Sequence, residues 1–143
     1  MIRQRLGKDL LFFDGGMGTL LQEKGLAPGE LPETWNLTHS EEIYKIHRQY
    51  IEAGSDIILT NTFGANALKF HDDSCSLEEI IKAAVSHVKK AEREALLQTG
   101  DERKIYTALD VGPTGKLLKP MGDLEFETAY EAFKEVVILG EQA

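Results

Sequence analysis

The chain has 143 residues, 42% of them apolar and 28% charged, which is typical of one globular domain. Its formal net charge is −8 and its Lys and Arg residues are scattered, so we expect neither nucleic acid nor a membrane as a partner. The single cysteine excludes an internal disulfide. No apolar run approaches the roughly 20 residues that a bilayer span needs. Together these features predict a cytoplasmic protein.

The first predicted element is a short buried strand over residues 10–13, which runs directly into Asp14-Gly15-Gly16-Met17-Gly18. Glycines at a strand end let the backbone approach a ligand closely, because they lack Cβ and tolerate positive φ. Residues 20–37 contain Gly and Pro at intervals that interrupt any helical period, and we expect a long, irregular loop there.

Further helices and strands follow in alternation. The expected ranges are a helix over 38–54, a strand over 55–61, a helix over 76–100, a strand over 104–111 and a helix from 126 nearly to the end. A possible short helical turn lies within 65–70. Thr38-x-x-Glu41 and Ser76-x-x-Glu79 both have the form of a capping box, which predicts that a helix begins at each.

The order βαβαβα predicts an α/β fold with parallel strands. An eight-stranded β/α barrel and a doubly wound open sheet share this pattern, and both place ligands at the carboxyl ends of the strands. Asp14, Thr60-Asn61 and Asp110 follow the expected strands, so these groups should converge on one face. The interpretation is a partial TIM barrel made of the first three β/α units, whose uncovered edges should lead to self-association.

Each candidate residue also has a purely structural explanation. Asp14 could accept a ligand's ammonium group beside a nest of Gly15–Gly18 amides, or it could cap its own loop. Thr60-Asn61-Thr62 and Asp110 could face a ligand or serve as loop caps. Trp35 could form a lid or a pocket wall, or it could anchor its own loop.

Metal binding has weak support in the sequence. His71 and Cys75 are four residues apart with Asp72 and Asp73 between them, but the stretch looks like a helix entry and lacks a full ligand set. The remaining histidines, His39, His47 and His87, are isolated in the sequence, and we expect them on the surface.

Several ordered motifs together resemble a known family. The motifs are Asp14-Gly15-Gly16-Met17-Gly18-Thr19, Trp35-Asn36, Tyr50-Ile51-x-Ala53-Gly54-Ser55-Asp56-Ile57-Ile58, Thr60-Asn61-Thr62-Phe63-Gly64-Ala65-Asn66 and Asp110-Val111-Gly112-Pro113-Thr114-Gly115. They are similar to the N-terminal half of the homocysteine S-methyltransferase domain, and most similar to the first module of cobalamin-dependent methionine synthases. Residues 1–143 would then form the N-terminal part of a truncated, homocysteine-binding barrel domain.

The resemblance implies a barrel that binds homocysteine at its strand ends and activates the sulfur on zinc for methyl transfer, forming methionine. Asp14, Gly15 and Gly16 would grip the amino-acid end of the substrate. Asn61 and Thr62 would line the same pocket. Met17 and Asp110 complete the substrate-binding set that the resemblance implies. Cobalamin and folate would be bound by other modules, so the partners are homocysteine, the remainder of the barrel and those modules.

The chain departs from the family at the metal centre. The family's zinc ligands are cysteines in Gly-x-Asn-Cys and Gly-Gly-Cys-Cys motifs, and neither motif occurs here. We therefore expect no metal ligands and no catalytic residue in this chain, and no activity from it alone. An alternative is a short, non-catalytic binding or assembly module that keeps the amino-acid grip. The methyl donor, whether methylcobalamin or folate, betaine or S-methylmethionine, is left open.

Overall fold

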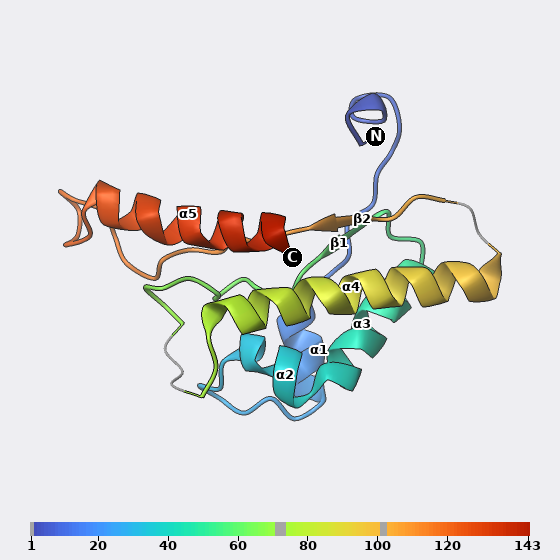
Figure 1. Cartoon of the computed structure of the whole chain (residues 1–143), viewed down its shortest axis with the longest axis horizontal. Coiled ribbons are helices and arrows are strands. Elements are labelled where there is room, and N and C mark those ends of the chain that lie inside the picture. The colour runs from blue at the N-terminus through green and yellow to red at the C-terminus, as the bar shows by residue number, and fades with distance from the viewer. Residues whose placement is uncertain (1, 71–73, 101–102) are drawn as a thin grey trace.

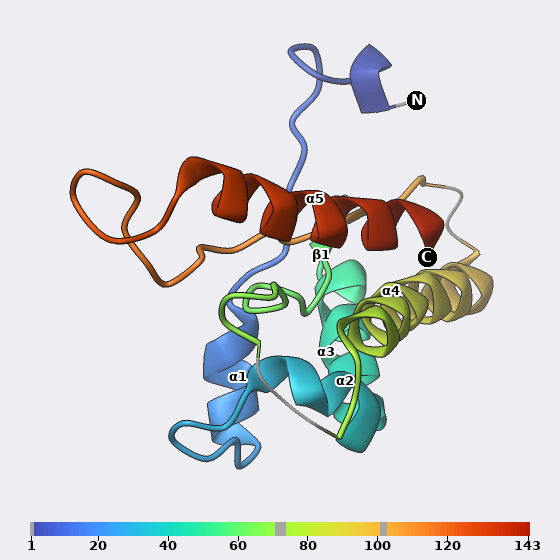
Figure 2. The same cartoon turned by 60° about the vertical axis from the view of Figure 1, so that its left-hand side comes forward.

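The computed structural model describes residues 2–70, 74–100 and 103–143. Its helices and strands are η1 (Ile2–Gln4), α1 (Met17–Glu23), η2 (Pro32–Thr34), α2 (Trp35–Thr38), α3 (Ser40–Glu52), β1 (Ile57–Leu59), α4 (Leu77–Thr99), β2 (Tyr106–Ala108) and α5 (Phe126–Gln142). None of the helices in this part of the chain combines the length and apolarity that a bilayer span requires. The N-terminal turn η1 stands away from the rest of the molecule in both views (Figures 1 and 2).

The parallel strand arrangement is confirmed. β1 and β2 pair in parallel, with Ile57 opposite Tyr106 and Leu59 opposite Ala108. The expected first strand over 10–13 is reduced to a parallel bridge between Phe13 and Ile57. Leu10 is 82% exposed, and an uncovered strand edge has little to extend it.

Local sequence signals mark the start of α4 and the ends of α3 and α4. At the start of α4, the Ser76 hydroxyl accepts from the Glu79 amide at 3.2 Å, and the Glu79 carboxylate accepts from the Ser76 amide at 2.8 Å. The predicted capping box there is confirmed. Gly100 ends α4 with a φ of +64°, and Gly54 follows α3 with a φ of +109°, conformations that favour glycine.

The other predicted capping box, at Thr38, is wrong. α3 begins at Ser40, and no side chain caps it. The Thr38 hydroxyl donates instead to the Thr34 carbonyl at 3.2 Å, because Thr38 is the last residue of the preceding short helix α2. The prediction of an irregular loop over 20–37 also needs correction, since α1, η2 and α2 occupy much of it.

Three clusters of buried side chains form the core. One joins α3, β1 and α4, a second joins α4, α5 and the 65–70 segment, and the third holds α1 and α2 against α3. Trp35 belongs to the third cluster, where it is 3% exposed, and its indole donates to the Glu30 carboxylate at 2.6 Å. It is therefore an anchor of its own segment.

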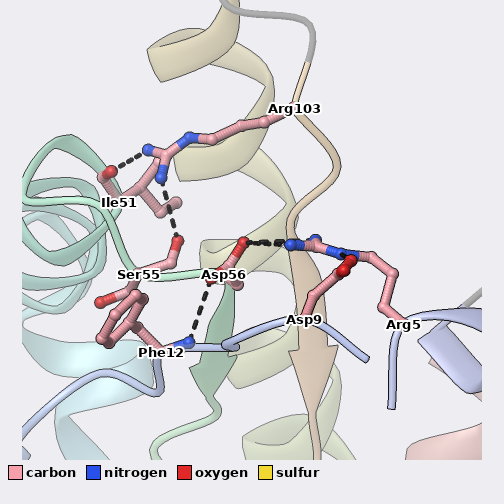
Figure 3. Close-up of polar contacts among 7 residues, drawn as sticks. All are labelled: Arg5, Asp9, Phe12, Ile51, Ser55, Asp56 and Arg103. Carbon is pink, nitrogen blue, oxygen red and sulfur yellow. Dashed lines mark hydrogen bonds and ion pairs between the residues drawn. The ribbon is translucent and has the colours of Figure 1, made fainter. Parts of the chain in front are cut away.

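Arginines tie the amino-terminal ends of the strands together, as Figure 3 shows. Asp56, the residue before β1, accepts from the Phe12 amide at 3.0 Å and from Arg5 at 3.3 Å. Arg103 donates to the Ile51 and Ser55 carbonyls. Since these contacts lie at the end of β1 that precedes Ile57, the opposite, carboxyl end is free to form a site.

Candidate functional site

A cavity of about 340 Å³ lies at the carboxyl ends of the strand positions. Its lining residues come from the segment after Phe13, from η2 and its approach, and from the loops after β1 and β2; they are Asp14, Gly15, Gly16, Met17, Gly18, Leu31, Pro32, Glu33, Leu59, Thr60, Asn61, Phe63, Lys69 and Asp110. The structure thus brings together Asp14, Gly15, Gly16, Met17, Asn61 and Asp110 of the predicted set.

Asp14 is half-buried at the wall of the cavity. Its Oδ2 accepts from the Leu59 amide at 3.1 Å, while Oδ1 is sealed from solvent and has no hydrogen-bond partner among the described residues. Burial raises the pKa of Asp14 to about 6, with a smaller contribution from the charge of Asp110, and the amide hydrogen bonds oppose this shift. Burial also raises the pKa of Asp110. Burial thus makes the ionised form of both carboxyls less favourable at this cavity.

The glycines after Asp14 do not form the nest that the sequence suggested. Gly15, Gly16 and Gly18 all lack positive φ, and α1 begins at Met17 with Gly16 as an extended N-cap. A nest needs alternating right- and left-handed residues, so this backbone does not form one. Gly15 instead packs closely against Tyr50, because a Cβ there would lie 2.7 Å from the Tyr50 hydroxyl.

Asn61 is fixed by the segment that covers the cavity. Its Nδ2 donates to the Pro32 carbonyl at 2.8 Å and to Asn36 Oδ1 at 3.2 Å. Asn36 Nδ2 in turn donates to the Asn61 carbonyl at 2.8 Å. Because both hydrogens of the Asn61 amide are used, this side chain can offer a ligand only its acceptor oxygen.

Thr62 does not line the cavity. Its hydroxyl donates to the Asp110 carbonyl at 2.8 Å, and the Asp110 amide donates to the Thr60 hydroxyl at 3.2 Å. The two hydroxyls lie 2.7 Å apart, and Thr60 must be the donor between them because the Thr62 proton is already committed. This closed set of hydrogen bonds locks the loops after β1 and β2 together.

The predicted surface positions of two histidines are wrong. His47 is 0% exposed, and neither ring nitrogen has a partner among the described residues. His87 is half-buried, and its Nε2 lies 2.7 Å from the Asn36 carbonyl, which can only accept, so Nε2 carries a proton. Of the three histidines in the described part of the chain, only His39 is exposed, stacked on Trp35 with ring centroids 4.1 Å apart. The packing of α3 and α4 against α2 buries the other two.

Sequence reasoning missed Glu33, Phe63 and Lys69 as cavity residues. Glu33 follows Pro32 in a stretch expected to be an irregular loop, and no pattern there marks it for burial.

The possible metal pair His71 and Cys75, with Asp72 and Asp73, falls largely outside the described residues. Within the described residues, no group of three or more His, Cys, Asp or Glu side chains is placed to hold a metal.

Comparison with known proteins identifies relatives of this chain. A sequence model of the homocysteine S-methyltransferase family matches residues 11–142. Methionine synthase from Mycobacterium leprae is 30% identical over 138 residues, which are 92% of this chain and 11% of that protein. Methionine synthase from Mycobacterium tuberculosis is 30% identical over 139 residues, which are 93% of this chain and 12% of that protein.

Solved structures with the same fold include the homocysteine methyltransferase MmuM from Escherichia coli. Its metallated form aligns with a TM-score of 0.68 at 24% identity, over 80% of this chain and 42% of that one. Its apo form aligns with a TM-score of 0.69 at 23% identity, over 95% of this chain and 46% of that one. The chain thus spans a small part of the curated relatives and less than half of the solved ones. The match over residues 11–142 shows that the chain belongs to the homocysteine S-methyltransferase family.

Proposed function

We propose that this chain supplies the amino-acid-binding part of an enzyme that methylates the sulfur of homocysteine to form methionine. The observation that carries the proposal is Asp14, a half-buried carboxylate at the cavity wall whose Oδ2 accepts one amide hydrogen bond. A substrate ammonium in the cavity would be attracted to this carboxylate, and charge-assisted hydrogen bonds are the strong ones. Family membership supports homocysteine as the amino acid.

The neighbouring residues have distinct roles in this proposal. Asn61 offers an acceptor oxygen, Gly15 and Gly16 bring backbone close to the ligand, and Asp110 adds negative charge. Met17 contributes apolar surface to the same wall. Thr62 positions Asp110 through its hydroxyl. We further propose that residues 1–143 form one arc of a β/α barrel, which the parallel pairing of β1 and β2 supports.

The side chains of this chain do not fit the zinc centre that the resemblance implies. The chain has one cysteine, and the described residues include no cluster of potential metal ligands. We propose that the zinc ligands, and the modules for cobalamin and folate, lie in other parts of the intact protein. This chain would then bind homocysteine without methylating it, in the cytoplasm.

Isothermal titration of the 143-residue chain with homocysteine tests the proposal. We expect the wild type to bind and Asp14→Asn to bind roughly ten to a hundred times more weakly, because it loses a charge-assisted hydrogen bond. Asp9→Asn, which alters an exposed carboxylate paired with Arg5, is the matched control and should bind as the wild type does. Equal binding by Asp14→Asn and the wild type, or no binding by the wild type, would overturn the proposal.

A methyl-transfer assay separates the enzyme from the alternative of a non-catalytic binding module. Methionine formation is measured for this chain and for the intact protein, with homocysteine and each candidate methyl donor. We expect product from the intact protein and none from the chain alone. Homocysteine binding without methyl transfer by the intact protein would favour the binding module.

A further inference from the structure

Glu33 is a buried carboxylate with an incomplete set of partners. It is 3% exposed, and its side chain has one hydrogen bond among the described residues, from the Gly64 amide to Oε1 at 2.5 Å. Burying a carboxylate is costly unless it is well paired, and a single neutral amide satisfies only part of its acceptor capacity. The remaining capacity therefore needs another partner.

The second carboxylate oxygen of Glu33, Oε2, is available to a ligand. Glu33 is one of the lining residues, and Oε2 accepts no hydrogen bond from the described residues. Oε2 is not sealed in the protein, in contrast to Asp14 Oδ1. A ligand in the cavity can therefore reach it.

The local backbone is shaped around this carboxylate. A Cβ at Gly64 would lie 2.7 Å from Oε1 and 3.1 Å from Oε2 of Glu33. A glycine at this position leaves the space that the carboxylate occupies. The 61–64 loop and η2 are also joined by the Asn61 to Pro32 hydrogen bond, so Glu33 is held by a rigid wall.

The charges around the cavity favour a ligand with a positive group. Three carboxylates line it, from Asp14, Glu33 and Asp110, against one ammonium, that of Lys69. The Lys69 Nζ lies 5.0 Å from the centroid of the Phe63 ring, within range of a cation–π contact. Lys69 forms no ion pair with Glu33 among the described residues.

We propose that Glu33 is a specificity-determining residue, which accepts a hydrogen bond through Oε2 from the positively charged group of the ligand. The inference rests on the proposed function, because it takes that ligand to be an amino acid such as homocysteine. Glu33 then adds to the role of Asp14 and selects amino acids over thiol acids that lack the ammonium. The relevant comparison ligand is 4-mercaptobutyrate, which is homocysteine without its amino group.

NMR titration of the 143-residue chain with each ligand tests this inference, because it detects weak binding as well. The main variant is Glu33→Gln, which keeps the volume and an acceptor for the Gly64 amide but places a neutral NH₂ donor where Oε2 was. We expect it to weaken homocysteine binding roughly ten to a hundredfold and to leave 4-mercaptobutyrate binding unchanged or stronger. The ratio of the two affinities is the readout, since a purely structural role would lower both affinities together.

The outcomes distinguish the two proposals. A Gly64 amide that stays protected from hydrogen exchange in free Glu33→Gln shows that the wall is intact. If Asp14→Asn loses homocysteine while Glu33→Gln keeps the wild-type affinity ratio, the inference about Glu33 is overturned and the proposed function stands. If the wild type binds neither ligand, both are overturned.

Discussion

At the scale of single residues, burial sets the chemistry of Asp14. Its pKa is raised to about 6, so the carboxylate changes its charge within the range where binding can be measured. A ligand ammonium needs the ionised form. At neutral pH the buried, ionised carboxylate of Asp14 lowers the free energy of unfolding of the free protein. A bound ammonium group would stabilise this ionised form.

Homocysteine affinity should therefore depend on pH. We expect a constant affinity above about pH 7 and a loss of roughly tenfold per pH unit below 6, because protonated Asp14 no longer attracts the ammonium. Titration calorimetry between pH 5 and 8 measures this dependence, and Asp14→Asn should remove most of it. A wild-type affinity that stays flat down to pH 5 would contradict the assigned role.

His47 is a second buried titratable residue, and it acts on stability. Burial, with a smaller effect of the His87 charge, lowers the pKa of His47 to about 3. Its ordinary pKa in the unfolded chain is near 6.5, so the unfolded state binds the proton more tightly between these values. The contribution to stability is present above pH 6.5 and is lost as the pH falls below it.

Unfolding by urea at pH 6.5 and pH 5 should show this loss. The expected contribution is about 1.4 kcal/mol per pH unit, or roughly 2 kcal/mol over this interval. His47→Leu should remove that part of the pH dependence. Ile46→Val, at a neighbouring buried position, is the control and should lower stability by a similar amount at both pH values. An unchanged pH dependence in His47→Leu would show that another group is responsible.

At the scale of elements, the two Ser/Thr-x-x-Glu sequences show how local signals succeed and fail. Ser76 and Glu79 exchange hydrogen bonds at a helix start that is free of competing structure. Thr38 has the same spacing to Glu41, but the short helix α2 runs through it and directs its hydroxyl back to Thr34. A capping box forms only where the chain before it is not already helical.

This difference predicts unequal effects of alanine substitution. Ser76→Ala should lower the free energy of unfolding by about 1 kcal/mol, because it removes a side-chain cap from α4. Thr38→Ala should change it by no more than about 0.5 kcal/mol, as expected at an exposed position without a cap. Denaturant unfolding of both variants measures the effects, and equal losses would mean that the two sites have the same role.

At the scale of the whole molecule, large apolar side chains remain exposed on several elements. Leu10, Phe12 and Phe13 are exposed along the first strand position, and Phe126 and Tyr130 are exposed on α5. Exposed apolar patches beside an unpaired strand edge favour association with further chain. The remainder of a barrel or a second copy could cover them.

The isolated chain should therefore self-associate. Light scattering over a range of concentrations should show a mass above that of a monomer, and Phe12→Lys with Phe126→Glu should reduce it. Glu41→Lys, a charge change on an exposed residue of α3, is the control and should leave the mass unchanged. A wild-type chain that remains monomeric with a cooperative melt would contradict this expectation.

Much of the fold could be predicted because its signals are local. The helix period, the Ser76 cap and the glycines after α3 and α4 give the order of the elements. The same order identified Asp14, Asn61 and Asp110 as strand-end residues. Strand lengths were overestimated, because a strand extends only as far as its neighbour pairs with it, and residues 10–13 have one short partner.

The sequence by itself therefore determined the order of the longer helices and the paired strands, the parallel pairing and the set of polar groups at the strand ends, since periodicity and short spacings encode these. Only the tertiary structure decided which groups are buried and which atoms remain unpartnered. Glu33 meets Gly64 across 31 positions of the chain, and His47 is enclosed by contacts between helices. Burial and hydrogen-bond pairing arise from contacts between segments that are distant in the sequence, so local sequence patterns do not predict them.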